Sequence, residues 1–320
     1  MIIIIKINQN RCPENFNGLV NSLLAAVALI ITSCLVNISS AAQDRNGTKI
    51  IATFLPIYMF TKAVTGETGE IELLIPAGAD PHEYQATPKD AATIAKADVL
   101  VKNGLGLEEF LDKLVNASSN SQLQEIDASK NIKPIEEDEN DHHDHDHDHG
   151  HEQGNPHVWL DPVLAQQQVK NIRDGLVKAN PNNATTYQAN ASIYLQKLQQ
   201  LDQEFKTRLA DFKGCKFIVF HDAYPYLAKR YNLQQISVVE LPQDYITPRD
   251  VQRVINTTKE YEVKGLLAEI GFNDSRMEKI AKDLKLPLKK LNPMNSGSLD
   301  PEYYFTAMRN NLNSLEEVCK

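Results

Sequence analysis

Short runs of aliphatic and β-branched residues alternate in this chain with segments of helical periodicity, and this alternation limits the fold more than any other feature. The apolar runs occupy residues 50–54, 71–75, 99–101, 217–220, 236–239, 265–268 and 288–291. Each run has the length of a buried strand, and helical segments follow most of them, including one expected over 107–115. Strands that alternate with helices predict parallel sheets covered on both faces. The expected fold class is therefore α/β.

One helical segment is much longer than the others. Residues 183–212 contain no Pro or Gly, and apolar side chains recur there mainly at steps of three and four residues. Such a helix would be about 45 Å long at 1.5 Å per residue. An ordinary long core helix would give the same pattern, but a rigid linker between two lobes is the more informative interpretation. We expect α/β lobes over 48–180 and 213–320, joined by a linker helix over 181–212.

The N-terminus has the features of an export signal. Lys6 and Arg11 precede an apolar run over 23–31 that is too short for a confident membrane span. Small residues at 39–41 fit a signal-peptidase site, which would make residues 1–42 a signal peptide. The sequence ending at Cys34 fits a lipoprotein processing site instead, and Cys34 would then carry a lipid anchor. Export is expected in either case, whereas anchoring stays open.

Two cysteines, Cys215 and Cys319, lie outside this leader. In an oxidising compartment they could form one disulfide that pins the C-terminus near the strand at 217–220. Spacing alone does not establish that their geometry permits it. Neither has a neighbouring Cys or His at zinc-finger spacing, so a cysteine-based metal site is not expected.

Six of the nine histidines lie in an acidic tract, which we define as residues 136–154. A run of this composition cannot build a packed core, and a solvated charge run is its simplest interpretation. Neutral imidazoles and carboxylates in it could also collect zinc, with an affinity below that of an ordered site. The candidate low-affinity ligands are His142, His143, His145, His147, His149, His151, Asp144, Asp146 and Asp148.

The tract also accounts for the acidity of the chain. Residues 136–152 contain nine Asp and Glu and no Lys or Arg, which equals the formal net charge of −9. The remainder of the chain is therefore nearly neutral. Nucleic-acid binding would require a basic face, so it is not expected.

The three remaining histidines, His82, His157 and His221, stand in polar segments where helices or strands end. An acidic residue that could fix the imidazole tautomer or cap a helix lies close to each: Glu83, Asp161 and Asp222. Ligand groups in open α/β sheets lie at the carboxyl ends of strands, where His221 is expected. A lone histidine is more often structural, but three similar contexts predict one metal site between the lobes.

The sequence resembles the solute-binding proteins of bacterial zinc and manganese ABC importers, the ZnuA-like family. The resemblance runs from about Lys49 to the C-terminus. It is carried by the stretches Pro81-His82-Glu83-Tyr84, Asn155-Pro156-His157-Val158-Trp159-Leu160-Asp161-Pro162 and Phe220-His221-Asp222-Ala223-Tyr224. It implies two lobes joined by a long helix with small hinge motion. It also implies a monomer without enzymatic activity that captures Zn²⁺ in the periplasm and delivers it to a membrane ABC permease.

The same resemblance implies a ligand set. His82, His157 and His221 would bind the zinc ion, with water in the fourth position. Manganese-type members commonly carry Glu at the position of His221, and nitrogen ligands suit zinc better than manganese. Weaker candidates for the fourth ligand are Asn292, Glu240 and Glu269.

Other functions remain as alternatives. The first is binding of manganese or a broader range of divalent metals. The second is a zinc-dependent hydrolase, because three His and a water also hold catalytic zinc, although the chain has no His-Glu-x-x-His motif. The third is an adhesin or a zinc buffer, for which the tract alone would suffice.

Overall fold

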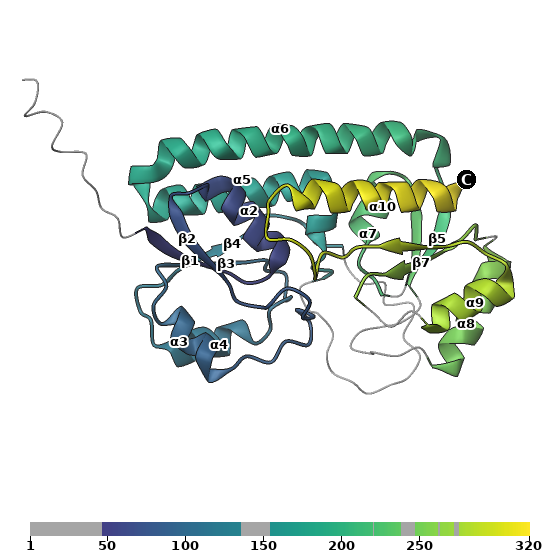
Figure 1. The fold of residues 1–320 in the computed structure, drawn as a ribbon, viewed down its shortest axis with the longest axis horizontal. Helices are drawn as coiled ribbons and strands as arrows, with labels where there is room; N and C mark the ends of the chain where they lie inside the picture. The colour runs from purple at the N-terminus through teal and green to yellow at the C-terminus, as the bar shows by residue number, and fades with distance from the viewer. Residues whose placement is uncertain (1–46, 136–153, 220, 238–246, 262, 272–274) are drawn as a thin grey trace, which may run out of the picture. The chain divides into compact units, whose positions relative to one another are not determined.

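The computed structural model describes residues 47–135, 154–219, 221–237, 247–261, 263–271 and 275–320 (Figure 1). The expected signal peptide, Cys34, Glu240 and the histidines of the tract lie outside these residues. Residues Thr48–Lys320 form one compact unit. Within the described part of the chain, no helix has both the length and the apolar character needed to cross a membrane.

The first sheet consists of four parallel strands in the order β2-β1-β3-β4. The strands are β1 (Thr48–Ala52), β2 (Gly69–Leu73), β3 (Val99–Lys102) and β4 (Gln124–Asp127). Consecutive residues of β1 face opposite sides, as the pleat of a strand requires. Ile50 belongs to the core formed with α2 (Leu55–Thr65) and α5 (Pro162–Ala179), and Ile51 to the core formed with α3 (Pro88–Ile94) and α4 (Leu111–Ser118).

The second sheet repeats this topology in the order β6-β5-β7-β8, again with parallel strands. Its strands are β5 (Lys216–Val219), β6 (Gln234–Ser237), β7 (Leu266–Glu269) and β8 (Leu288–Leu291). One face packs on α7 (Pro225–Arg230) and α10 (Tyr303–Cys319), and the other on α8 (Pro248–Glu260) and α9 (Ser275–Leu284). The predicted α/β class with two parallel sheets is confirmed.

The long helix between the two sheets is α6 (Ala184–Arg208), which is followed by a 3₁₀ turn over Ala210–Phe212. It packs on α2 and α5 of the first lobe and on α10 of the second (Figure 1). Its buried face includes Tyr194, whose hydroxyl donates to the Pro301 carbonyl at 3.0 Å. A single buried apolar cluster contains strand residues from both sheets, such as Val101 and Val219. The two lobes therefore share one core.

The structure differs from the expectation at two places in the first lobe. No strand was expected at β4, because Gln124 and Glu125 are exposed and only Ile126 is buried there. A sheet edge with one buried side chain leaves no apolar run in the sequence. Helix α4 begins at Leu111 instead of 107, after Gly104 and Gly106 adopt positive φ angles of 82° and 75°.

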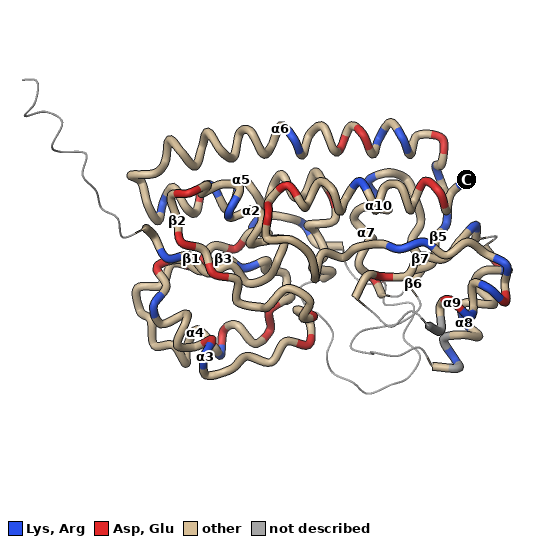
Figure 2. The backbone as a smooth tube through the Cα atoms, viewed as in Figure 1, with Lys and Arg blue, Asp and Glu red and all other residues tan. Residues whose placement is uncertain are grey.

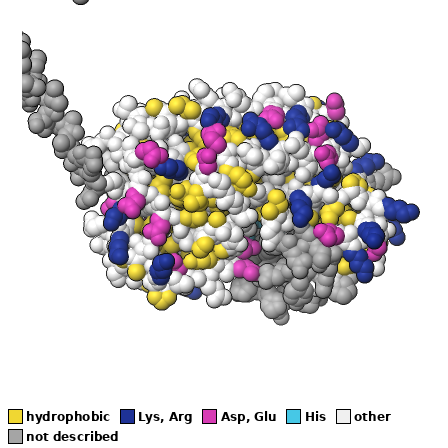
Figure 3. All heavy atoms as spheres, in the orientation of Figure 1, with side chains coloured by type: hydrophobic (Ala, Val, Ile, Leu, Met, Phe, Trp, Pro, Cys, Tyr) yellow, Lys and Arg dark blue, Asp and Glu magenta, His cyan; other side chains and the backbone are white. Residues whose placement is uncertain are grey.

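The second lobe contains a disulfide between Cys215 and Cys319, with an S–S distance of 1.98 Å. It joins the residue before β5 to the last residue of α10, which are 104 positions apart. Elsewhere the surface is mixed in character. Acidic and basic residues are spread along the chain in Figure 2, and acidic, basic and apolar side chains are interspersed on the face that Figure 3 shows.

Candidate metal centre

The three isolated histidines follow the carboxyl ends of strands in both sheets. His82 lies in the connection after β2, where its backbone N–H donates to Asp80 Oδ1 at 2.9 Å. His157 lies after β4 and immediately before the 3₁₀ turn Val158–Leu160. His221 comes two residues after β5. The first lobe therefore supplies two imidazoles and the second supplies one.

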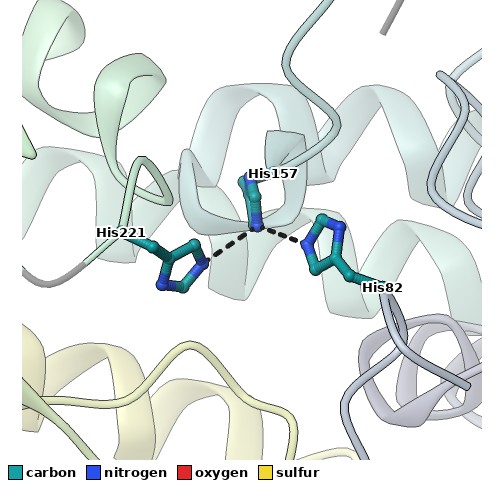
Figure 4. Close-up of side chains that lie close together, drawn as sticks. All are labelled: His82, His157 and His221. Atoms are coloured by element: carbon teal, nitrogen blue, oxygen red, sulfur yellow. Dashed lines mark hydrogen bonds between the residues drawn. The ribbon is translucent and has the colours of Figure 1, made fainter. Parts of the chain in front are cut away.

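The three imidazoles converge through their Nε2 atoms (Figure 4). The Nε2 atom of His157 lies 3.1 Å from that of His82 and 3.3 Å from that of His221. One ring nitrogen from each histidine lies within 4.8 Å of the other two, and no Cys, Asp or Glu of the described residues joins this group. In a tetrahedral zinc site with Zn–N bonds of about 2.0–2.1 Å, two nitrogens are separated by about 3.3 Å. The observed spacing therefore fits such a site.

His157 is held by a neutral partner. The Asn155 Oδ1 atom lies 3.0 Å from His157 Nδ1 and also accepts from the His157 backbone N–H at 3.0 Å. An amide oxygen only accepts hydrogen bonds, so Nδ1 carries the proton and Nε2 presents its lone pair to the common centre. The His157 ring also contacts Trp159, the only tryptophan, at a centroid distance of 5.0 Å. His157 is 4% exposed, so these contacts leave it little freedom.

His221 is held by a carboxylate instead. Glu269, the last residue of β7, accepts from the His221 backbone N–H at 3.1 Å, and its Oε2 atom lies 2.7 Å from His221 Nδ1. Burial by itself disfavours the charged imidazole. The charge of Glu269 and its hydrogen bond outweigh burial and raise the pKa of His221.

Asn155 also connects the two lobes beside the histidines. Its Nδ2 atom donates to the backbone oxygen of Asp222 at 2.7 Å and to Asp222 Oδ2 at 3.0 Å. Its backbone N–H donates to Ile135 O at 3.0 Å, and its carbonyl accepts from the Tyr226 hydroxyl at 2.5 Å. The Tyr226 hydroxyl in turn accepts from Ile135 N–H at 3.0 Å. The residues that flank the tract are thus hydrogen-bonded to each other and to the second lobe.

The acids near the histidines also make contacts with other residues. Asp161 caps α5 by accepting from Val163 N–H at 2.8 Å, and it pairs with Arg230 at 2.8 Å. Asp222 accepts from Asn155 and from Gln235, and Glu83 is exposed. The positions beside Nδ1 of His157 and His221 belong to Asn155 and Glu269.

The structure also shows the contacts of two of the three candidates for a fourth ligand. The Oδ1 atom of Asn292 accepts from Met294 N–H at 2.7 Å, and its Nδ2 atom donates to the Tyr303 hydroxyl. Glu269 lies behind His221, on the Nδ1 side of the ring. Glu240 is outside the described residues.

Comparison with known proteins supports the resemblance found in the motifs. Residues 50–318 match the model of the ZnuA family, described as periplasmic component A of a zinc-uptake complex. The chain belongs to this family. The ZnuA family consists of solute-binding components of metal transport and not of enzymes.

Some relatives of this chain are named for zinc, and one is named for manganese. The high-affinity zinc uptake system protein ZnuA of Bacillus subtilis is 34% identical over 304 residues, which cover 92% of this chain and 95% of the relative. The manganese-binding lipoprotein MntA of Halalkalibacterium halodurans is 29% identical, with 82% and 84% covered. A crystal structure of ZnuA aligns with a TM-score of 0.74 at 27% identity and covers 86% of this chain and all of that one.

Proposed function

We propose that this protein binds Zn²⁺ with high affinity in the periplasm and delivers it to a membrane ABC permease. The observation that carries the proposal is the convergence of three imidazole Nε2 atoms, from His82, His157 and His221, at spacings suited to zinc. Imidazole nitrogen is a preferred ligand of zinc, whereas manganese prefers oxygen ligands. The zinc-uptake name of the family and of the Bacillus subtilis relative supports the same metal.

The proposed site holds its cargo with three protein ligands and a water. Because His82 and His157 come from the first lobe and His221 from the second, a small separation of the lobes would remove one ligand from the ion. Such a site can bind tightly and still release the ion to a partner. The shared apolar core and α6 favour small displacements over a wide opening.

The proposal extends to parts of the chain outside the described residues. Residues 1–42 would export the protein, and Cys34 would carry a lipid if the lipoprotein site is used; relatives named as lipoproteins support this second route. The tract would collect zinc weakly, in addition to the ion held by the three isolated histidines. We propose that the exported protein acts as a monomer.

The test is a zinc titration followed by the emission of Trp159, whose ring contacts that of His157. Wild type, a deletion of residues 138–152 and His221→Ala are titrated against a chelating competitor. We expect wild type and the deletion to bind one tight zinc, and His221→Ala to lose it. If tight binding disappears with the deletion and survives in His221→Ala, the protein is a histidine-tract buffer instead.

The manganese alternative has one specific observation in its favour, the similarity to MntA. It is tested by adding Mn²⁺ to the zinc-loaded deletion variant. An all-imidazole donor set predicts that manganese does not displace zinc at equal concentration. Displacement would identify the protein as a manganese or broad-range receptor.

A further inference from the structure

Glu269 is a buried carboxylate whose two oxygen atoms both face one residue. Its side chain is fully buried, and it ends β7, the strand that pairs with β5. One oxygen accepts from the His221 backbone N–H at 3.1 Å, and the other lies 2.7 Å from His221 Nδ1. Among the described residues, His221 supplies the only basic side-chain nitrogen within 4.0 Å of the Glu269 carboxylate. A carboxylate buried in this way is costly unless a positive charge offsets it.

The placement of this carboxylate fixes where the proton of His221 resides. A carboxylate beside Nδ1 requires a proton on Nδ1, which leaves the lone pair on Nε2. Nε2 is the atom that lies 3.3 Å from His157 Nε2. A Zn²⁺ ion bound there would supply positive charge on the far side of the same ring. Glu269 therefore has both the geometry and the charge to support a cation at the site.

We propose that Glu269 is a positioning residue of the zinc site, which orients His221 and offsets the charge of the bound ion. The inference rests on the proposed function and adds to it the residue on which the second lobe's contribution depends. The first lobe provides an internal contrast, because Asn155 orients His157 with a neutral amide. The carboxylate in direct contact with the His221 ring thus belongs to the second lobe.

A purely structural role for Glu269 makes a different prediction. Its hydrogen bond to the His221 backbone could simply hold the segment after β5. In that case replacement of Glu269 would lower the stability of the metal-free protein. Zinc affinity would then fall only in proportion to this loss of stability. A positioning role predicts a loss of affinity beyond the loss of stability.

Glu269→Gln is the decisive variant because it keeps the size of the side chain. Two donors of His221 face this side chain, and an amide offers one acceptor and one donor. If the amide nitrogen faces Nδ1, the imidazole must carry its proton on Nε2, which removes the lone pair from the metal. We expect zinc affinity to fall about 10- to 100-fold, the usual effect of removing the hydrogen-bond partner of a ligating histidine. Glu269→Asp keeps the charge with a shorter reach and should recover part of the loss.

The matched control is Asp202→Asn, another change of a buried acid to its amide. Asp202 lies on α6, is 7% exposed, and accepts from Lys206 at 2.6 Å and from the Tyr231 hydroxyl at 3.2 Å. It contacts none of the three histidines. The control should lower thermal stability and leave zinc affinity unchanged.

All variants are made in the whole protein and titrated with Zn²⁺ through Trp159 emission, with melting of the metal-free forms measured in parallel. Visible absorption with Co²⁺ in place of zinc reports the ligand arrangement, and it should change in Glu269→Gln and stay as in wild type in Asp202→Asn. The inference is overturned if Glu269→Gln binds like wild type, or if it loses affinity only as its melting temperature predicts. If wild type itself binds no tight zinc, the proposed function fails as well.

Discussion

His157 of the first lobe and His221 of the second are supported by different chemistry. In the first lobe, Asn103 Nδ2 donates to the Pro156 carbonyl at 3.1 Å, and Gln168 Nε2 donates to Asn103 Oδ1 at 2.9 Å. Together with Asn155, these neutral amides hold the segment of His157. In the second lobe, His221 rests on the carboxylate of Glu269, and a disulfide ties β5 to α10. The surroundings of His157 should therefore tolerate changes of charge and pH better than those of His221.

The largest effect is expected from His221→Glu, which places a second carboxylate against Glu269. Like charges in a buried site repel, so the new ligand would bind poorly. Zinc affinity should fall on the order of 10²–10³-fold, because about 10–16 kcal/mol of apparent binding is divided among four ligands in structural zinc sites. Trp159 emission provides the measurement.

The double variant His221→Glu/Glu269→Gln tests the origin of that loss. It removes the repulsion and should recover part of the affinity, with manganese gaining on zinc because an oxygen replaces a nitrogen ligand. If the effects of the two substitutions on zinc affinity simply add, residue 221 does not depend on the charge of Glu269. That result would contradict the contrast between His157 and His221.

The second-largest effect is expected from removal of the disulfide between Cys215 and Cys319. Replacing both Cys215 and Cys319 by Ala should lower the free energy of unfolding by about 2–4 kcal/mol, as expected for opening a long loop. Zinc affinity of the folded protein should not change, since neither cysteine contacts a histidine. Urea unfolding with and without zinc measures both quantities. A loss of affinity would show that the disulfide positions His221.

A smaller effect is expected from Asn155→Asp in the first lobe. The change removes two hydrogen bonds to Asp222 and brings two carboxylates together, at a cost of about 1–3 kcal/mol in unfolding free energy. Asn171→Asp is the matched control, because the Nδ2 atom of Asn171 also donates two hydrogen bonds, to the backbone carbonyls of Ala128 and Lys130. Equal losses of zinc affinity in both variants would rule out a special role of Asn155.

The pH dependence is the smallest effect and has opposite signs with and without metal. Since the pKa of His221 is raised, its proton competes with zinc, and affinity should fall by about tenfold per pH unit on the acid side of that pKa. In the metal-free protein, the charged His221 stabilises the fold below the unfolded-state pKa, and this contribution is lost as pH rises through the folded-state pKa. Glu269→Gln should shift both transitions to lower pH. If wild type and Glu269→Gln have identical pH profiles, Glu269 does not act on the protonation of His221.

The sequence predicts those parts of the molecule that leave a pattern within a short window. The apolar runs of β1, β3 and β5 mark buried strands, and the motif around each isolated histidine marks the segments that meet in Figure 4. Edge strand β4 leaves no such pattern because it buries only Ile126.

The partners of the histidines depend on contacts between distant segments. Glu269 is 48 residues from His221, and only the pairing of β5 with β7 brings the two together. Its position directly after the apolar run 265–268 was the one available signal. Asn155 is near His157 in sequence, but no sequence signal marks its amide, rather than the nearby acid Asp161, as the partner of the ring.

The contacts of Asn155 with Ile135 have a consequence for how this protein can vary. The backbone hydrogen bond between them and the shared Tyr226 hydroxyl fix the exit and re-entry points of the chain, whatever the number of residues between. Closing a loop costs only about 0.6 kcal/mol more for each doubling of its length. Insertions and deletions between Ile135 and Gly154 should therefore be nearly neutral for stability. The metal-binding body, and not the length or composition of the segment between, thus sets where the chain leaves and re-enters the fold.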